Sequence, residues 1–308
     1  MTEKYYAHSL ERRPPSEWQL LEEHLKNVAE MARSFSDGFG AGDWGYLAGL
    51  WHDIGKYSDD FQRMLRAKDG SDAHIEKIGR VDHSTAGAKN AFNTFGDKGK
   101  LLAYAIAGHH GGLPDGNSNN TCLYNRLEKT ILDYSSCPEH ILKGKNLGDL
   151  PFGPDTSSSK RFAFQISFFI RMIYSCLVDA DFLDTEAFMD KDRSLWRKGY
   201  PSLLELNKRL NADLKQLSAS ASKTPINQRR AEVLKSCLSA AEQPQGLFSL
   251  TVPTGGGKTL SSLAFAMKHA LKHNLKRIIY VIPYTSIIEQ NAAVFRKILG
   301  ENEVLAGR

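Results

Sequence analysis

The chain has 308 residues, of which 41% are hydrophobic and 24% are charged, as in an ordinary soluble globular protein. This length favours two compact units over one. No N-terminal stretch has the order of a signal peptide, and the most apolar segment is interrupted by charges, which argues against a membrane span. The four cysteines lie far apart, so we expect a reduced, cytoplasmic protein. We also expect a monomer without a membrane partner.

The net charge of +5 is unevenly distributed along the chain. Residues 197–235 contain nine Lys or Arg against three Asp or Glu, and residues 236–308 contain eight against four. The first 196 residues therefore carry a net negative charge. A basic C-terminal part suits contact with a polyanion, although solvated basic helices give the same count.

The first 200 residues are predicted to be almost entirely helical. A capping-box pattern, Ser16 followed by Gln19, predicts a helix that begins near Ser16. Its apolar side chains then recur every three or four residues as far as Phe35. The same periodicity and the turn residues between segments predict further helices over about 43–53, 84–95, 99–109 and 160–182.

The second part of the chain changes character. Residues 201–245 are predicted to form two polar helices that act as a basic linker. GLFSLTV (246–252) and RIIYVIP (277–283) have the composition of short buried strands, and a helix is predicted after each. This order is how a parallel α/β sheet begins. The predicted fold is mainly α: an all-helical domain over 1–200, the linker, and the beginning of an α/β domain over 246–308.

Histidines and aspartates recur near the ends or the core faces of the predicted helices. Taken singly, a histidine on an apolar face is most often an ordinary core residue. Imidazoles and carboxylates that arrive from separate helices, however, build metal sites inside helical domains, and such mixed ligands suit first-row divalent metals. This set is too large for one ion, so two ions that share a carboxylate are expected. The candidate ligands are His24, His52, Asp53, His83, His109, His110 and Asp179.

Three motifs in this set carry a resemblance to a known family. HDIGK (52–56), DHSTAGA (82–88) and AGHHGG (107–112) stand in the order that resembles the HD nuclease domain of the CRISPR-associated helicase–nuclease of type I interference. The resemblance implies that Asp53 bridges two metals and that Lys56 meets substrate phosphate, although a lysine at a helix end can also satisfy carbonyl groups. The implied ligands are His24, His52, Asp53 and Asp179 for one metal, and Asp53, His83, His109 and His110 for the other.

The segment VPTGGGKT (252–259) is a Walker A loop between a predicted strand and a predicted helix. In such loops backbone N–H groups close on phosphates, the lysine reaches the terminal phosphates and the threonine ligates Mg²⁺. With VIPYTSIIEQNA (281–292), the loop resembles motifs I and Ia of a superfamily-2 helicase, whose first domain is RecA-like. No Walker B acid follows, so helicase activity is expected only in a longer protein. The expected nucleotide-binding residues are Thr254, Gly255, Gly256, Gly257, Lys258 and Thr259.

The resemblance implies a metal-dependent nuclease that hydrolyses single-stranded DNA by a two-metal mechanism. The implied cofactors are two Mn²⁺, Fe²⁺, Co²⁺ or Ni²⁺ ions, with Mg²⁺ also possible, and ATP with Mg²⁺ for the complete helicase. The implied partners are single-stranded DNA and an RNA-guided surveillance complex of the Cascade type. Two other hypotheses stay open: an HD phosphohydrolase acting on nucleotides or cyclic dinucleotides, and a binding module whose HD site is structural.

Overall fold

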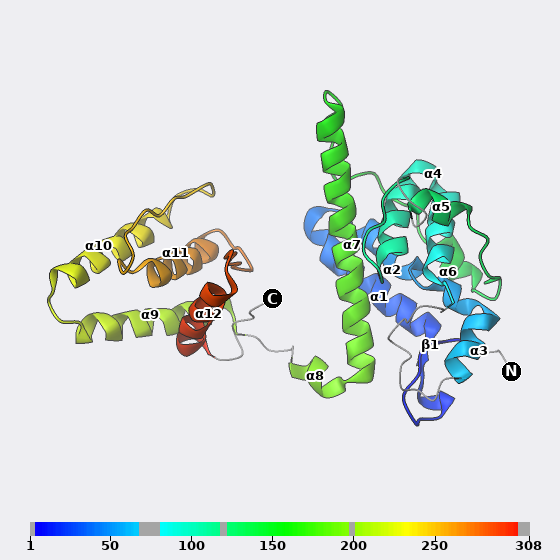
Figure 1. The fold of residues 1–308 in the computed structure, drawn as a ribbon, viewed down its shortest axis with the longest axis horizontal. Coiled ribbons are helices and arrows are strands. Elements are labelled where there is room, and N and C mark those ends of the chain that lie inside the picture. The colour runs from blue at the N-terminus through cyan, green and yellow to red at the C-terminus, as the bar shows by residue number, and fades with distance from the viewer. Residues whose placement is uncertain (1–3, 68–80, 118–121, 197–200, 301–308) are drawn as a thin grey trace. The chain divides into compact units, whose positions relative to one another are not determined.

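The computed structural model describes residues 4–67, 81–117, 122–196 and 201–300. The chain divides into two compact units, with the boundary between Trp196 and Arg197. The fold is mainly α, as the sequence predicts (Figure 1). Among the described residues, no helix combines the length and the apolar character needed to cross a bilayer.

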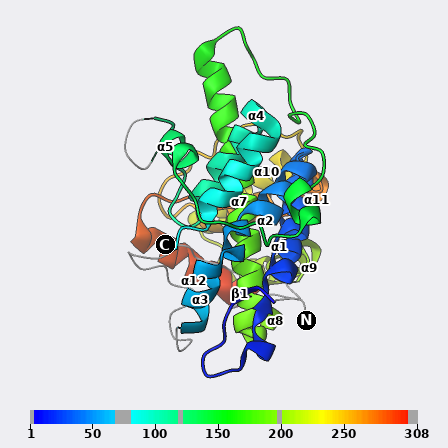
Figure 2. The same ribbon diagram turned by 90° about the vertical axis from the view of Figure 1, so that its right-hand side faces the viewer.

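The first unit is organised around the long helix α7 (Ser159–Met189), which packs against α1 (Leu21–Ser36), α2 (Gly42–Trp51) and α4 (Ser84–Gly108). In both views the N-terminal end of α7 extends beyond these neighbours (Figures 1 and 2). Shorter elements complete the unit, namely the helices α3 (Asp59–Ala67), α5 (Leu123–Glu128), α6 (Glu139–Lys143) and α8 (Lys191–Trp196) and the 3₁₀ helices η1 (Pro15–Glu17), η2 (Asp37–Phe39) and η3 (Ile54–Tyr57).

One continuous apolar core joins α1, α2, α4 and α7. Trp44 and Trp51 of α2 are its largest fully buried side chains, and the Trp51 indole donates to the Ile141 carbonyl at 2.7 Å. The helices α1 and α2 cross closely at Gly49, where a Cβ atom would lie 2.6 Å from the Ala29 Cα. Only glycine permits this approach, which brings the side chains of the two helices together at the end of α2.

The element α4 reverses direction within its length. A straight helix of 25 residues would hold its ends about 37 Å apart. Instead, His83 before its first residue and His109 after its last both lie 3.3 Å from the same carboxylate oxygen. The chain turns at Gly96, whose φ of 57° and ψ of −129° suit glycine. The prediction of two helices, over 84–95 and 99–109, is therefore confirmed.

The start of the first predicted helix is wrong. Ser16 lies in η1, and α1 begins only at Leu21. The reason is that Gln19 and Leu20 form strand β2 (Gln19–Leu20), which pairs antiparallel with β1 (Tyr6–His8). This short hairpin, which the sequence did not predict, is the one β structure among the described residues of the first unit.

The second unit contains α9 (Leu203–Ser220), α10 (Pro225–Ala240), α11 (Lys258–Lys272) and α12 (Thr285–Leu299). Apolar residues of α9, α11 and α12 share one core, against which the apolar face of α10 also packs. The segment 201–245, for which the sequence predicts a linker, therefore belongs to the body of this unit. Hydroxyls of Ser202 and Thr224 cap α9 and α10 by accepting from main-chain N–H groups.

The two predicted strands of the second unit do not form. Residues 246–252 and 277–283 have no ladder partner among the described residues, where β1 and β2 make the one sheet. Leu247, Ile279 and Val281 are at least 80% exposed. Buried strands of a parallel sheet need neighbours on both edges and helices on both faces, and these segments have neither here. The two predicted strands are therefore not paired into a sheet in the part of the chain that the structure describes.

Candidate metal centre

The HD pair lies at the point where α2 ends. His52 still has helical backbone angles, whereas Asp53 leaves the helix with φ −121° and ψ 18°. A continuing helix would aim the two adjacent side chains about 100° apart. The break allows both to face the interior, and they are 0% and 1% exposed. This is how two neighbouring polar residues reach one buried site.

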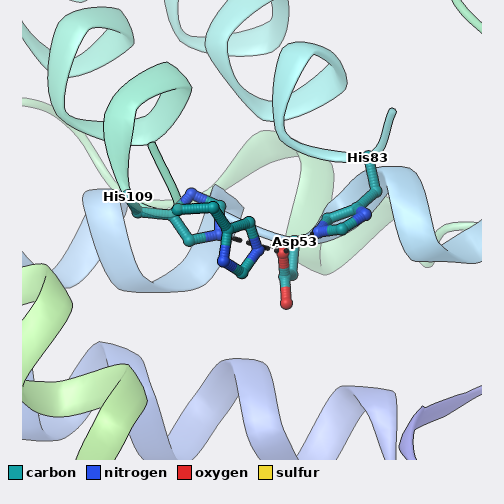
Figure 3. A group of neighbouring side chains, drawn as sticks. Asp53, His83 and His109 are labelled. Carbon is teal, nitrogen blue, oxygen red and sulfur yellow. Dashed lines mark hydrogen bonds and ion pairs between the residues drawn. The ribbon is translucent and has the colours of Figure 1, made fainter. Parts of the chain in front are cut away.

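Asp53 divides its two carboxylate oxygens between two groups of histidines. Oδ1 lies 3.3 Å from Nε2 of His83 and 3.3 Å from Nε2 of His109. Oδ2 lies 3.4 Å from Nε2 of His52 and 3.8 Å from Nε2 of His24. Figure 3 shows the Asp53 carboxylate between His83 and His109. One carboxylate thus faces two separate sets of imidazole nitrogens.

The same four histidines all present Nε2 to the centre because Nδ1 is engaged elsewhere. A carbonyl or carboxylate oxygen can only accept, so each Nδ1 carries a hydrogen and the Nε2 lone pair of the neutral ring is available to a cation. The Nδ1 partners are the carbonyl of Gly49 for His52 (2.7 Å), of Ile106 for His109 (2.7 Å) and of Val81 for His83 (3.2 Å), and the carboxylate of Asp184 for His24 (2.7 Å).

The centre contains buried polar atoms that the described residues do not satisfy. Oδ1 of Asp53 and Nε2 of His109 make no hydrogen bond with the part of the chain that the structure describes, and Oδ2 of Asp53 has the Lys56 ammonium as its partner at 2.7 Å. Leaving such a group unpaired costs about 1–3 kcal/mol. A bound cation would satisfy both unpaired atoms at once, so these residues fit a divalent metal.

Three overlapping sets of ligand atoms, each within 4.8 Å of one another, surround Asp53 and its neighbours. Two of them correspond closely to the predicted pairing and share Asp53. The sets are Asp53, His83, His109 and His110; His24, His52 and Asp53; and His52, His109 and Asp181.

The structure does not bring Asp179 into this centre, and Asp181 takes the place expected for it. Asp179 is exposed, whereas Oδ1 of Asp181 lies 3.4 Å from Nε2 of His24 and 3.6 Å from Nε2 of His52. The reason is helical phase: measured from the buried Leu177, Asp179 is rotated by about 200° and Asp181 by about 40°. That signal is present in the sequence, since the apolar stripe of the helix passes through Leu177.

The carboxylates of the centre stay ionised. Burial alone would raise the pKa of Asp53, but the ammonium of Lys56 and the imidazole of His52 lower it well below its usual range. Burial also opposes ionisation of Asp181, and hydrogen bonds from His24 and His52 lower its pKa in the same way. Negative charge is therefore built into the centre at neutral pH.

The histidines differ in charge. Burial lowers the pKa of His24, but the carboxylates of Asp181, Asp184 and Asp53 outweigh it and raise the value to about 10. Burial also lowers the pKa of His52, but the carboxylates of Asp53 and Asp181 outweigh it and raise the value to about 9. The two Nε2 atoms are 3.3 Å apart, so the pair holds protons between the carboxylates when no cation is bound. A cation that takes this position must displace them.

Lys56 and His110 occupy different positions at the centre. Lys56 is 5% exposed, with Nζ 2.7 Å from Oδ2 of Asp53 and 3.3 Å from the Ala7 carbonyl. It balances the Asp53 charge from inside the protein, and its contact with substrate phosphate stays a prediction. His110 is exposed, and its Nε2 lies 3.0 Å from Nε2 of His83.

The glycine-rich loop lies in the second unit, directly before α11. Gly255 and Gly257 adopt φ values of 81° and 87°, and Lys258 is the first residue of the helix. The guanidinium of Arg230 donates to the Gly255 carbonyl at 2.9 Å. Four of the six predicted nucleotide-binding residues, 254–257, thus lie in the loop and the other two, Lys258 and Thr259, begin α11, an arrangement that favours anions.

Two segments of the chain match two different families of known proteins. Residues 21–133 match the HD domain, and residues 223–307 match the res subunit of type III restriction enzymes. The first match contains the predicted histidines and Asp53 but ends before Asp181; the second contains the glycine-rich loop. No curated protein matches the chain. The chain therefore carries an HD domain, of the metal-dependent phosphohydrolase type, followed by a helicase-like domain.

Proposed function

We propose that the first unit is a nuclease that hydrolyses phosphodiester bonds of single-stranded DNA with two divalent metal ions. The observation that carries this proposal is the Asp53 carboxylate, which faces one histidine group with each oxygen. Two ions held by these residues would activate water and neutralise charge on the phosphate and the leaving oxygen. The helicase-like match over 223–307 supports a nucleic acid as substrate over a free nucleotide or cyclic dinucleotide.

Residues of the first unit would orient the metal-binding side chains and leave an opening for the substrate. The buried histidines hold Nε2 toward the centre through their Nδ1 hydrogen bonds. Asp181, with a side chain 19% exposed, and His110 are the more open members of the cluster, whereas the others are at most 7% exposed. Substrate would therefore approach between these two side chains.

The ligand chemistry also limits the metals. Imidazole-rich sites suit Mn²⁺, Fe²⁺, Co²⁺ or Ni²⁺ better than Mg²⁺, which prefers oxygen ligands and retains its waters. We propose that the glycine-rich loop binds ATP and Mg²⁺ when it is part of a complete helicase, in which a Walker B acid also holds the Mg²⁺. The two-metal chemistry uses no group of the glycine-rich loop, so DNA cleavage by this chain is expected to be independent of ATP.

The order of the sequence motifs supports a proposal about the source of the DNA substrate. HDIGK, DHSTAGA and AGHHGG, followed by a helicase-like domain, resemble the helicase–nuclease of type I CRISPR interference. We propose that the substrate is the DNA strand displaced by an RNA-guided surveillance complex of the Cascade type. The basic residues of 197–308 would favour contact with that polyanion.

A cleavage assay tests the proposal. A labelled single-stranded oligonucleotide is incubated with Mn²⁺, Co²⁺, Ni²⁺ or Mg²⁺, without ATP, beside an EDTA control. The proposal predicts cleavage that EDTA and Asp53→Ala abolish and that the exposed control Asp179→Ala retains. Hydrolysis of nucleotides or cyclic dinucleotides without DNA cleavage would instead identify a phosphohydrolase. No hydrolysis and no retained metal would leave a binding module.

A further inference from the structure

His24 differs from the other buried histidines of the centre in the partner of its Nδ1. His52, His83 and His109 each contact a neutral main-chain carbonyl through this atom. His24 instead donates to a carboxylate, Oδ2 of Asp184, at 2.7 Å. Asp184 is 6% exposed and lies in α7, 160 residues along the chain from its partner.

Asp184 is held by two further donors. Nε2 of Gln19 donates to Oδ2 at 2.7 Å, and Nδ2 of Asn27 donates to Oδ1 at 2.9 Å. Because a carboxylate only accepts, the Gln19 amide must direct its nitrogen to Asp184 and its oxygen away. That oxygen lies 2.7 Å from Nδ1 of His8, which must then be the donor. The network joins β1, β2, α1 and α7 and fixes the carboxylate from both sides.

We infer that Asp184 is a positioning residue for the metal position built on His24 and His52, and that the position at His83 and His109 does not depend on it. A carboxylate behind an imidazole fixes the ring and its tautomer and makes Nε2 a stronger ligand, and removing such partners typically costs 10–100-fold in metal affinity. Asp181 adds a second carboxylate near this position, 3.4 Å from Nε2 of His24. The position at His83 and His109 has carbonyl partners behind its rings.

This inference rests on the proposed metal binding and makes a separate prediction about it. The substitution Asp184→Asn keeps the shape of the side chain but replaces one acceptor oxygen by a donor NH₂ group. Three donors, from His24, Gln19 and Asn27, converge on that side chain. At least one of them must lose its acceptor, and the His24 ring loses its charged partner. Metal binding at His24 and His52 is therefore expected to weaken about 10–100-fold, with binding at His83 and His109 unchanged.

The test is calorimetric titration of the full chain with Mn²⁺, together with the visible spectrum of the Co²⁺-loaded protein. Asp179→Asn is the matched control, because it makes the same change on an exposed position of the same helix. His83→Ala assigns the two binding steps, since it should weaken only the step at His83 and His109. Thermal unfolding of each metal-free variant checks that it is folded.

The outcomes separate the two proposals. No metal binding by the unsubstituted chain would overturn the proposed function itself. Two-step binding in which Asp184→Asn weakens only the step that His83→Ala leaves intact, and alters the Co²⁺ spectrum of that step, supports the role of Asp184. Binding by Asp184→Asn equal to that of Asp179→Asn, or equal weakening of both steps, overturns it. If Asp184→Asn does not fold, Asn27→Ala, at an exposed position of α1, serves instead. Asn27→Ala should weaken metal binding at His24 and His52 by a smaller factor than Asp184→Asn. Unchanged metal binding, or equal weakening of both binding steps, would again overturn the inference.

Discussion

Gly55 lies in η3, between the HD pair and Lys56, and packs directly on the main chain of His83. A Cβ atom at this position would lie 2.3 Å from the His83 carbonyl oxygen and 2.7 Å from its Cα, whereas ordinary contact begins at 3.4 Å. The substitution Gly55→Ala therefore requires a separation of about 1.1 Å, the difference between 3.4 and 2.3 Å. The contacts are to backbone, so a side-chain rotation cannot relieve them.

The expected effects are on stability and on metal binding. Overpacking of this kind costs about 1–3 kcal/mol. Metal–ligand distances tolerate only about 0.2 Å, so a shift of His83 away from Asp53 should also weaken the ion held between them, by about tenfold or more. Gly38→Ala is the matched control, because Gly38 also lies in a 3₁₀ helix but a Cβ there meets nothing within 4 Å.

The assay is urea denaturation of the metal-free proteins, followed by Mn²⁺ titration of the folded forms. Gly55→Ala should unfold at lower urea concentration and bind Mn²⁺ more weakly than Gly38→Ala, which should behave like the unsubstituted chain. Equal unfolding midpoints and equal Mn²⁺ affinities for the two variants would refute the close packing of η3 on His83.

Three further predictions concern the charges of the centre. Asp181→Asn should lower Mn²⁺ affinity by at least about tenfold in a titration and Asp179→Asn should not, and the reverse order would contradict the placement of α7. Lys56→Met leaves the buried Asp53 without its ion pair, so urea denaturation should show a loss of about 3–5 kcal/mol without metal and a smaller loss with Mn²⁺; equal losses in both states would contradict this role. Because the pKa of His24 is raised from 6.5 to about 10, its charge stabilises the metal-free fold below pH 6.5, and this contribution is lost as the pH rises through 10. Mn²⁺ must displace this proton and that of His52, whose pKa is raised to about 9, so affinity should rise by up to about 100-fold per pH unit between pH 6 and 8. Calorimetry in two buffers should show the proton release, and pH-independent affinity would contradict the prediction.

The sequence predicts much of the centre because its motifs are local. HDIGK and AGHHGG each place their polar residues at a helix end, and glycines beside them permit the close packing that buries the site. The choice of Asp179 failed because it rested on the apolar character of the helix and not on its phase. Counting from Leu177 at about 100° per residue selects Asp181.

Other features depend on contacts that no local pattern contains. The Asp184 network joins Gln19 to a residue 165 positions later in the chain. Ser16 and Gln19 match a capping-box pattern, which predicts a helix where Gln19 in fact lies in a strand. The strand predictions at 246–252 and 277–283 reflect composition, but a strand also needs a partner to form its ladder. In these two segments the local composition favours strands, but no long-range partner is present to pair with them.

The central claim is that Asp53 bridges two metal positions. Anomalous diffraction from crystals of the chain soaked in Mn²⁺ tests it most directly. The structure predicts two manganese peaks on either side of the Asp53 carboxylate, one at His24 and His52 and the other at His83 and His109. No peak at Asp53, or manganese bound only elsewhere in the chain, would contradict the claim.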